Sequence, residues 1–292
     1  MKPMSQVRKP AMTAKSPPEA VDVRTQRSPL LLGVSLKMYF DHKETMDWCR
    51  RVAEIARKHP AVVGGDVTLV VLPTFPAIVP AAEIFAGTRV RIGAQNLYWE
   101  DRGAFTGEVS GPYLEQIGCR YVEIGHSERR RIFAESDEIV ASKVGAALRN
   151  NLIPIVCVGE SERVSAAEAA GVCIRQLVSA LGDTSQTGAR IVAAYEPKWA
   201  IGAVRPAPVE HIAFICAAVK EWLADQKLLV EGQFIYGGSA GPGLLSQIGR
   251  SVDGLFLGRF AHDPVALGGV LDEALRLGSP ASNTHSRHDR EG

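Results

Sequence analysis

Residues 120–160 read RYVEIGHSERRRIFAESDEIVASKVGAALRNNLIPIVCVGE and hold two short apolar runs on either side of a longer segment with helical periodicity. The runs, 120–125 and 153–158, are nearly continuous in apolar residues, as expected for parallel strands that are buried on both faces. The apolar residues between them fall on one stripe of a helix, namely Ile139, Val140, Val144, Ala147 and Leu148. Ser136 and Asp137 are candidates to cap its first turn. This stretch therefore predicts a strand, a covering helix and a second, parallel strand.

The same unit recurs along the chain. Eight short apolar runs are found, at 30–35, 67–72, 89–94, 120–125, 153–158, 190–196, 234–238 and 254–258. Helical periodicity recurs between the runs, most clearly at 43–58 and 209–226. Eight strand–helix repeats favour an α/β fold of the closed (β/α)8 barrel type over an open, doubly wound sheet. We predict a single barrel domain over residues 30–277.

The charge balance narrows the classes of partner. Of the 292 residues, 46% are hydrophobic, 33 are basic and 32 are acidic, which gives a net charge of +1. Such a balance gives no reason to expect nucleic acid or an anionic membrane as a partner.

Three features of the sequence indicate a cytoplasmic protein. No apolar run reaches the ~18 residues that a membrane-spanning helix needs. The N-terminus is charged but lacks the apolar region of a secretory signal. The five cysteines are odd in number and scattered in spacing, which argues against a disulfide framework and for reduced thiols.

Both ends of the chain lack a periodic apolar pattern. Residues 1–29 are rich in proline and charged or polar residues, and residues 278–292 are similarly polar. We predict that both segments are disordered tails. His285 and His288 fall in the second tail, where solvated side chains are expected rather than metal ligands.

Two cofactor-binding motifs are missing from the sequence. No G-x-G-x-x-G follows the first apolar run, and G-x-x-x-x-G-K-[ST] does not occur. A metal site built from His126, Glu128 and His262 is conceivable, but no H-x-x-x-H or cysteine pair supports it. These absences argue against a dinucleotide cofactor, a P-loop and a metal site.

Unusual polar residues follow the ends of several predicted strands, where barrels of this type build their sites. Lys37 follows the first run, His126 the fourth, and Glu196 ends the sixth. Glycine-rich turns follow the seventh and eighth runs, at 237–239 and 257–260. Each residue has an ordinary explanation, as a solvated lysine, a structural histidine or a turn-capping glutamate. Their convergence on one rim favours a catalytic site.

Five segments together resemble the triosephosphate isomerase family. They are AQNLYWEDRGAFTGEVS (94–110), VEIGHSERR (122–130), IPIVCVGE (153–160), AYEPKWAIG (194–202) and YGGS (236–239). The resemblance runs from about residue 30 to 275. It implies a cofactor-free TIM barrel that forms a homodimer and acts on a phosphorylated sugar of three or four carbons. It also implies that the segment 103–108 inserts into the neighbouring subunit.

The resemblance assigns a role to each polar residue of the rim. Glu196 is similar to the general base that moves a proton between adjacent carbons, and His126 to the neutral electrophile that polarises the carbonyl. Lys37 is similar to the cation that stabilises the enediolate, and Glu128 to a supporting carboxylate. Such a set is needed because a proton next to a carbonyl is weakly acidic.

The phosphate group and a mobile lid are also implied by the resemblance. An enediol phosphate tends to lose phosphate in water, so a lid that closes is expected, and 197–206 is similar to that lid. Backbone N–H groups of Gly202, Ser239 and Gly258 are expected to bind the phosphate.

Three departures from the family pattern bear on the substrate. Ser35-Leu36-Lys37 stands where N-W-K is usual, Ala203-Val204 where T-G is usual in the lid, and Arg259 in a turn that usually reads G-G-A-S. A branch of the family that acts on L-erythrulose 1-phosphate is similar in having serine at position 35, in YGGS-x-x-PG and in GLF-x-GR.

The departures favour the interconversion of L-erythrulose 1-phosphate and D-erythrulose 4-phosphate, because a shorter side chain at position 35 would admit one more hydroxymethyl group. Isomerisation of glyceraldehyde 3-phosphate and dihydroxyacetone phosphate is the alternative. A non-catalytic barrel that senses a metabolite is a second, more remote alternative.

Overall fold

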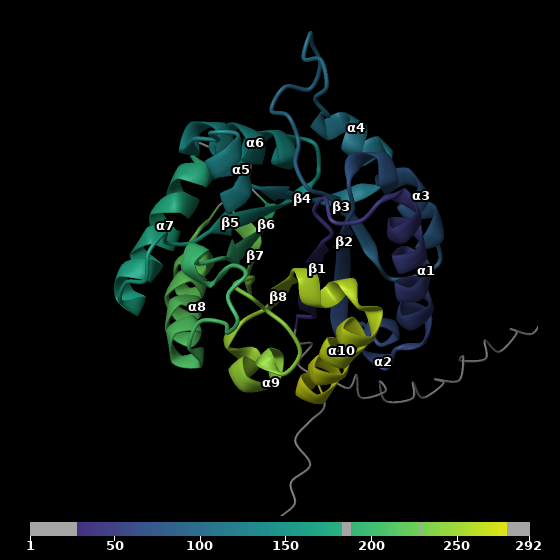
Figure 1. Ribbon diagram of the computed structural model, residues 1–292. Helices are drawn as coiled ribbons and strands as arrows, with labels where there is room; N and C mark the ends of the chain where they lie inside the picture. Colours follow the sequence, from purple (N-terminus) through teal and green to yellow (C-terminus); the bar gives the residue numbers. More distant parts are fainter. Residues whose placement is uncertain (1–27, 183–187, 228, 279–292) are drawn as a thin grey trace, which may run out of the picture.

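Eight parallel strands close into a barrel in chain order. The computed structural model describes residues 28–182, 188–227 and 229–278. The strands are β1 (Leu30–Ser35), β2 (Val67–Leu72), β3 (Arg91–Ala94), β4 (Cys119–Ile124), β5 (Ile153–Val158), β6 (Ala189–Tyr195), β7 (Leu229–Tyr236) and β8 (Gly254–Leu257). Strand β1 pairs in parallel with both β2 and β8, which closes the ring. The predicted (β/α)8 barrel is confirmed (Figure 1).

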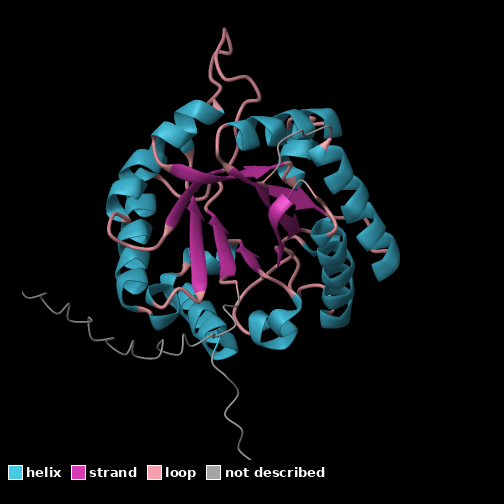
Figure 2. Ribbon diagram, turned by 180° about the vertical axis from the view of Figure 1, so that it is seen from behind, coloured by secondary structure: helices cyan, strands magenta, loops and turns pink. Residues whose placement is uncertain are grey.

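Helices surround the ring of strands (Figure 2). They are α1 (His42–Lys58), α2 (Pro60–Val63), α3 (Ile78–Ile84), α4 (Gly111–Gln116), α5 (Ser127–Ile132), α6 (Asp137–Arg149), α7 (Ala166–Leu181), α8 (Val209–Ala224), α9 (Leu244–Ile248) and α10 (Pro264–Gly278). Short 3-10 turns are η1 (Phe75–Ala77), η2 (Lys198–Ala200), η3 (Gly249–Ser251) and η4 (Arg259–His262). Within the described ranges, none of the helices has the length and apolar character to cross a membrane.

The helices begin where their sequences supply caps. Asp41 and Glu44 form a capping box at the start of α1, and Ser165 and Glu168 form another at the start of α7. Each box satisfies backbone N–H groups that have no partner within the helix. Ser136 accepts a hydrogen bond from the N–H of Ile139 at the start of α6, as predicted. The apolar stripes predicted for α1, α6 and α8 face the strands, with Ile139 half-buried rather than buried.

Side chains fill the barrel interior. Alternate residues of each strand point inward, and they form a cluster of their own: Leu31, Val70, Leu72, Tyr121, Ile153, Ile155, Cys157, Val192, Ala194, Ile235 and Phe256. Gly33 is required in this layer, because a Cβ atom there would lie 2.5 Å from the ring of Phe256. Burying the Phe256 side chain stabilises the fold by ~1.5–3 kcal/mol. Because side chains fill the interior, a small molecule is held at an end of such a barrel and not along its axis.

The boundaries of some elements differ from those predicted. The strand expected at 234–238 begins at Leu229, because pairing with β6 extends the ladder through a segment that has no apolar run. The strand expected at 89–94 begins at Arg91. Helix α10 continues through Gly278, one residue past the expected end of the domain. The predicted tails otherwise lie outside the described residues, apart from Ser28 and Pro29, and remain a prediction.

Candidate active site

A cavity of about 620 Å³ opens at the carboxyl ends of the strands. All nine residues that the sequence singled out line it: Ser35, Lys37, His126, Glu128, Glu196, Gly202, Ser239, Gly258 and Arg259. They come from segments that follow or end β1, β4, β6, β7 and β8, so the barrel closure brings together residues far apart in the chain. The structure thus places the whole predicted set around one space.

His126 lies between β4 and α5, where it caps the helix. Its Nδ1 accepts a hydrogen bond from the backbone N–H of Glu128 at 3.1 Å. The Glu128 carboxylate is also 3.6 Å from Nδ1, but the donated N–H shows that Nδ1 carries no proton. In the neutral ring the proton therefore sits on Nε2. Burial and the nearby Lys37 ammonium lower the pKa of His126 to about 4, so the ring is neutral near pH 7.

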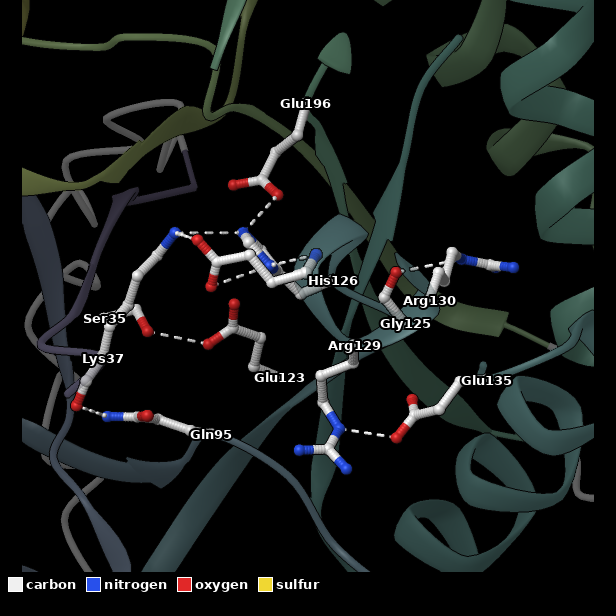
Figure 3. A network of polar contacts seen from close by, with 11 residues as sticks. Ser35, Lys37, Gln95, Glu123, Gly125, His126, Arg129, Arg130, Glu135 and Glu196 are labelled. Carbon is white, nitrogen blue, oxygen red and sulfur yellow. Dashed lines mark hydrogen bonds and ion pairs between the residues drawn. The ribbon is translucent and has the colours of Figure 1, made fainter. Parts of the chain in front are cut away.

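Glu196 directly follows β6 and faces His126 across the cavity. Its Oε2 lies 3.3 Å from Nε2 of His126 (Figure 3). The residue is only 7% exposed, and burial, together with the Glu123 carboxyl group, raises its pKa to about 8. Gly237 makes room for this side chain, because a Cβ there would lie 2.7 Å from its carboxyl oxygen Oε1. The carboxyl group is thus confined next to the imidazole.

Lys37 has a left-handed backbone, with φ of 48°. Gln95 braces this backbone by donating to the carbonyl oxygens of Lys37 and Leu72, at 3.1 and 2.9 Å. The ammonium group donates to Oε1 of Glu128 at 2.8 Å. Burial opposes its charge, but the hydrogen bond and the charge of Glu128 prevail and raise the pKa of Lys37. The same hydrogen bond outweighs partial burial and lowers the pKa of Glu128.

Two N–H donors converge at the centre of the site. Nζ of Lys37 lies 3.4 Å from Nε2 of His126. Because Nε2 carries a proton, both nitrogens are donors, and the contact is not a hydrogen bond between them. An oxygen atom placed beside both would receive two hydrogen bonds, one of them from a cation. Such an arrangement stabilises negative charge that develops on that oxygen.

The segment 197–206 covers one side of the cavity. Trp199 donates through Nε1 to Oε1 of Glu160 at 2.7 Å. The hydroxyl group of Ser239 lies 2.8 Å from the carbonyl oxygen of Ala200 and 3.0 Å from that of Ala203. These contacts hold the segment against the turns after β5 and β7.

The far end of this segment is held by Tyr236, whose hydroxyl group accepts the N–H of Ala207 at 2.9 Å. The tip between the two attachments is open to solvent, with Val204 98% exposed. A segment held at its ends and free at its tip has the layout of a lid.

The rim of the cavity offers groups that suit an anion. Gly202 and Ser239 have positive φ values of 71° and 54°. Among the described residues, the backbone N–H groups of these two residues donate no hydrogen bond. Arg259 adds a cation beside them, since a Cβ on Gly202 would lie 3.8 Å from its guanidinium group. Unpartnered N–H groups beside a cation are the usual surroundings of a phosphate.

Glu123 is a residue of the cavity that the sequence analysis missed. It lies on β4, is 3% exposed, and accepts a hydrogen bond of 2.8 Å from the Ser35 hydroxyl group (Figure 3). Burial raises its pKa to about 7. A signal was present, because a carboxyl group interrupts an otherwise apolar run, YVEI, at a position that points inward.

His262, which the metal hypothesis grouped with His126 and Glu128, also lines the cavity. Its ring packs against the rings of Tyr39 and Phe40, with centroids 5.2 and 4.7 Å away. Over the ranges that the structure describes, no group of three or more histidine, cysteine, aspartate or glutamate side chains is placed to hold a metal ion.

The fold is that of a (β/α)8 barrel, and comparison with known proteins places the chain among the isomerases. The sequence model of the family described as triosephosphate isomerase matches residues 30–273, and the chain belongs to the triosephosphate isomerase family.

Two relatives illustrate the range of names within the family. A protein of Pectobacterium atrosepticum named L-erythrulose-1-phosphate isomerase is 54% identical over 254 residues, which cover 86% of this chain and 98% of that protein. A triosephosphate isomerase of Moorella thermoacetica is 38% identical over 255 residues, which cover 84% of this chain and 98% of that protein.

Proposed function

We propose that this protein interconverts L-erythrulose 1-phosphate and D-erythrulose 4-phosphate by moving a proton between two adjacent carbons through an enediolate. The observation that carries the chemistry is the convergence on Nε2 of His126, with the Glu196 carboxyl group at 3.3 Å and the Lys37 ammonium group at 3.4 Å. The relative named for this four-carbon substrate is 54% identical, against 38% for the triosephosphate isomerase of Moorella thermoacetica. This difference supports the choice of substrate.

The three central side chains divide the proton transfers among them. The Glu196 carboxylate removes the proton from C3 of L-erythrulose 1-phosphate, and negative charge develops on the C2 oxygen. The N–H of His126 and the ammonium group of Lys37 stabilise that oxygen. His126 then passes the C3 hydroxyl proton to the C2 oxygen. The protonated Glu196 returns its proton to C2, which leaves a carbonyl at C3.

Glu128 is a positioning residue in this scheme. Its carboxylate holds the Lys37 ammonium group, and its backbone N–H fixes the histidine tautomer that can donate from Nε2. Both contacts keep the two donors aimed at the same point, and preorganised donors need no rearrangement during the reaction.

The rim groups bind the phosphate and exclude water. Backbone N–H groups of Gly202, Ser239 and Gly258 donate to the phosphate, and Arg259 adds a charge. The segment 197–206 closes over the intermediate, since an enediol phosphate exposed to water loses its phosphate.

Side-by-side measurement of kcat/KM on L-erythrulose 1-phosphate and glyceraldehyde 3-phosphate tests the proposal. We expect the four-carbon substrate to be preferred by at least about tenfold, since a pocket that merely has room discriminates ~10–200-fold. Ser35→Asn should shrink the preference by impairing the four-carbon substrate. A strong preference for glyceraldehyde 3-phosphate would instead establish the triosephosphate isomerase alternative. A folded protein inactive on both would favour the metabolite-sensing barrel.

A homodimer in the cytoplasm is part of the same proposal. The segment 103–108 belongs to a long connection between β3 and α4 that projects from the barrel (Figure 1). Loops of this length without regular structure are usually functional. The five cysteines are buried free thiols, as expected in a reducing compartment. Cell fractionation tests the compartment, and recovery from a periplasmic or secreted fraction would contradict it.

A further inference from the structure

The most buried polar residues that line the cavity are Ser35 and Glu123. Each of these residues is 3% exposed, whereas Arg259 at the rim is exposed to solvent. Ser35 ends β1, and Glu123 lies two residues beyond Tyr121 on the inward face of β4. Below them the barrel interior is almost wholly apolar. They therefore form the polar floor of the cavity.

The carboxyl group of Glu123 has more hydrogen-bonding capacity than the protein uses. A carboxylate offers about four lone-pair sites, and among the described residues Ser35 is its one hydrogen-bond donor. That bond uses Oε2, while the other oxygen points toward the catalytic side chains (Figure 3). The Ser35 oxygen also keeps lone pairs that can accept a hydrogen bond. Burial of a carboxyl group with one partner is unfavourable unless a ligand supplies another.

The floor lies where the end of the sugar far from the phosphate must reach. In the proposed function the phosphate is bound at the rim, and the reacting carbons lie beside Glu196 and His126. L-Erythrulose 1-phosphate carries a hydroxymethyl group on the carbon that loses its proton, at the end away from its phosphate. Triose phosphates have a hydrogen atom at that position.

We propose that Ser35 and Glu123 form a specificity subsite that binds the terminal hydroxyl group of a four-carbon sugar phosphate. The hydroxyl group donates to the free oxygen of Glu123 or to the Ser35 oxygen, and the Ser35 hydroxyl group holds the carboxyl group in place. The inference rests on the proposed function and assigns its substrate preference to two named side chains.

A different role for Glu123 would have a different signature. Its charge raises the pKa of the base Glu196, so its removal will change catalysis of every substrate through that base. Such an effect is the same whether or not the substrate has a terminal hydroxyl group. Only a direct contact with that hydroxyl group changes the ratio between substrates within one variant.

The test compares L-erythrulose 1-phosphate with its 4-deoxy analogue, in which a methyl group replaces the hydroxymethyl group. Proton–deuterium exchange at the reacting carbon, followed by NMR in D2O, gives kcat/KM for both compounds without a coupling enzyme. For the wild type we expect kcat/KM to be about 10- to 150-fold lower for the analogue than for L-erythrulose 1-phosphate. This is the usual effect of losing a hydrogen bond to a charged group. This comparison requires no variant.

Variants of Glu123 then test whether the floor causes the difference in kcat/KM between the two compounds. Glu123→Leu should lower kcat/KM for L-erythrulose 1-phosphate more than for the analogue, so that the ratio between the two compounds falls toward one. Glu123→Gln, which keeps an acceptor, should give an intermediate ratio. Tyr121→Phe is the matched control, because it lies on the same face of the same strand, one inward position deeper, and should leave the ratio unchanged.

The outcomes separate the two proposals. If the wild type prefers triose phosphates over L-erythrulose 1-phosphate, the proposed function fails and this inference fails with it. If it prefers L-erythrulose 1-phosphate but accepts the 4-deoxy analogue equally well, only the inference is overturned. The inference is also overturned if Glu123→Leu and Glu123→Gln lower kcat/KM for both compounds by one common factor.

Discussion

Two carboxyl groups share the buried end of the barrel, and their proximity sets the chemistry of each residue. Burial raises the pKa of Glu196 to about 8 and that of Glu123 to about 7. A base whose pKa lies near the working pH binds a proton more strongly than an ordinary carboxylate, while a fraction of it stays ionised near pH 7. The same surroundings keep His126 neutral, since burial and Lys37 lower its pKa. Acid and base roles thus follow from the surroundings of each group.

At the level of the base itself, Glu196→Asp should retain the fold and lose most of its turnover. The shorter side chain withdraws the carboxyl group by about one methylene, and a misplacement of ~1 Å can cost ~10²-fold in rate. Steady-state kinetics on L-erythrulose 1-phosphate measures the loss, and circular dichroism checks the fold. A folded variant with near wild-type kcat would exclude Glu196 as the base.

Stability should respond to pH through Glu123. Its pKa is raised from 4.5 to about 7 in the folded protein, so unfolding releases a proton between these values and the wild type loses stability as the pH rises from 4.5 to about 7. The loss is at most about 3 kcal/mol. Glu123→Gln lacks this titration, so its Tm relative to the wild type should rise from pH 5 to pH 8. Thermal melts of both proteins at pH 5 and pH 8 measure this Tm difference. The same difference at the two pH values would contradict a raised pKa for Glu123.

At the scale of elements, the strands could be predicted because each is buried on both faces and reads as a short apolar run. The first residues of β7, 229–233, could not be predicted from their composition. They form a strand because they pair with β6. The site residues at strand ends could be predicted, since parallel strands bring their carboxyl ends to one rim. Glu123 was missed because the apolar residues around it are enough to predict the strand, although its inward carboxyl group was itself a signal. Its partner Ser35, 88 residues away, is fixed only by barrel closure.

The proposed lid, 197–206, should depend on its attachment at Tyr236. Tyr236→Phe removes the acceptor of the Ala207 N–H, a hydrogen bond worth ~0.5–1.5 kcal/mol, so kcat/KM should fall about 2- to 10-fold. A looser lid admits water, so the inorganic phosphate released per turnover should increase. Tyr121→Phe, also a buried tyrosine but at the other end of the barrel, should change neither quantity. Unaltered phosphate release in Tyr236→Phe would argue against closure by this segment.

At the scale of the whole molecule, the barrel is a rigid support and its connections differ in length with their tasks. The turn from β8 to η4 is short and holds the rim glycine Gly258, whereas the connection of β3 to α4 spans residues 95–110. That connection is braced at its base, where the N–H of Tyr98 donates to the carbonyl oxygen of Val109 at 2.8 Å. Phe105 packs against Tyr98, with ring centroids 4.6 Å apart, but is still 39% exposed. A projecting segment with an exposed aromatic residue is suited to insertion into a second copy of the chain.

Sedimentation should therefore give a mass of about 63 kDa, twice the 31.4 kDa of one chain. Phe105→Lys should shift the protein toward a monomer and make its specific activity fall on dilution, because a lysine ammonium group without a partner is costly to bury in an interface. Phe214→Lys is the matched control: it places the same charge at another exposed phenylalanine, 51% exposed on α8, and should leave the dimer intact. Dissociation by mass action would lower activity only below a threshold concentration of Phe105→Lys, whereas damage to the fold would lower it at every concentration. A wild-type monomer with full activity at assay concentrations would contradict the dimer, and the loop 95–110 would then need another role.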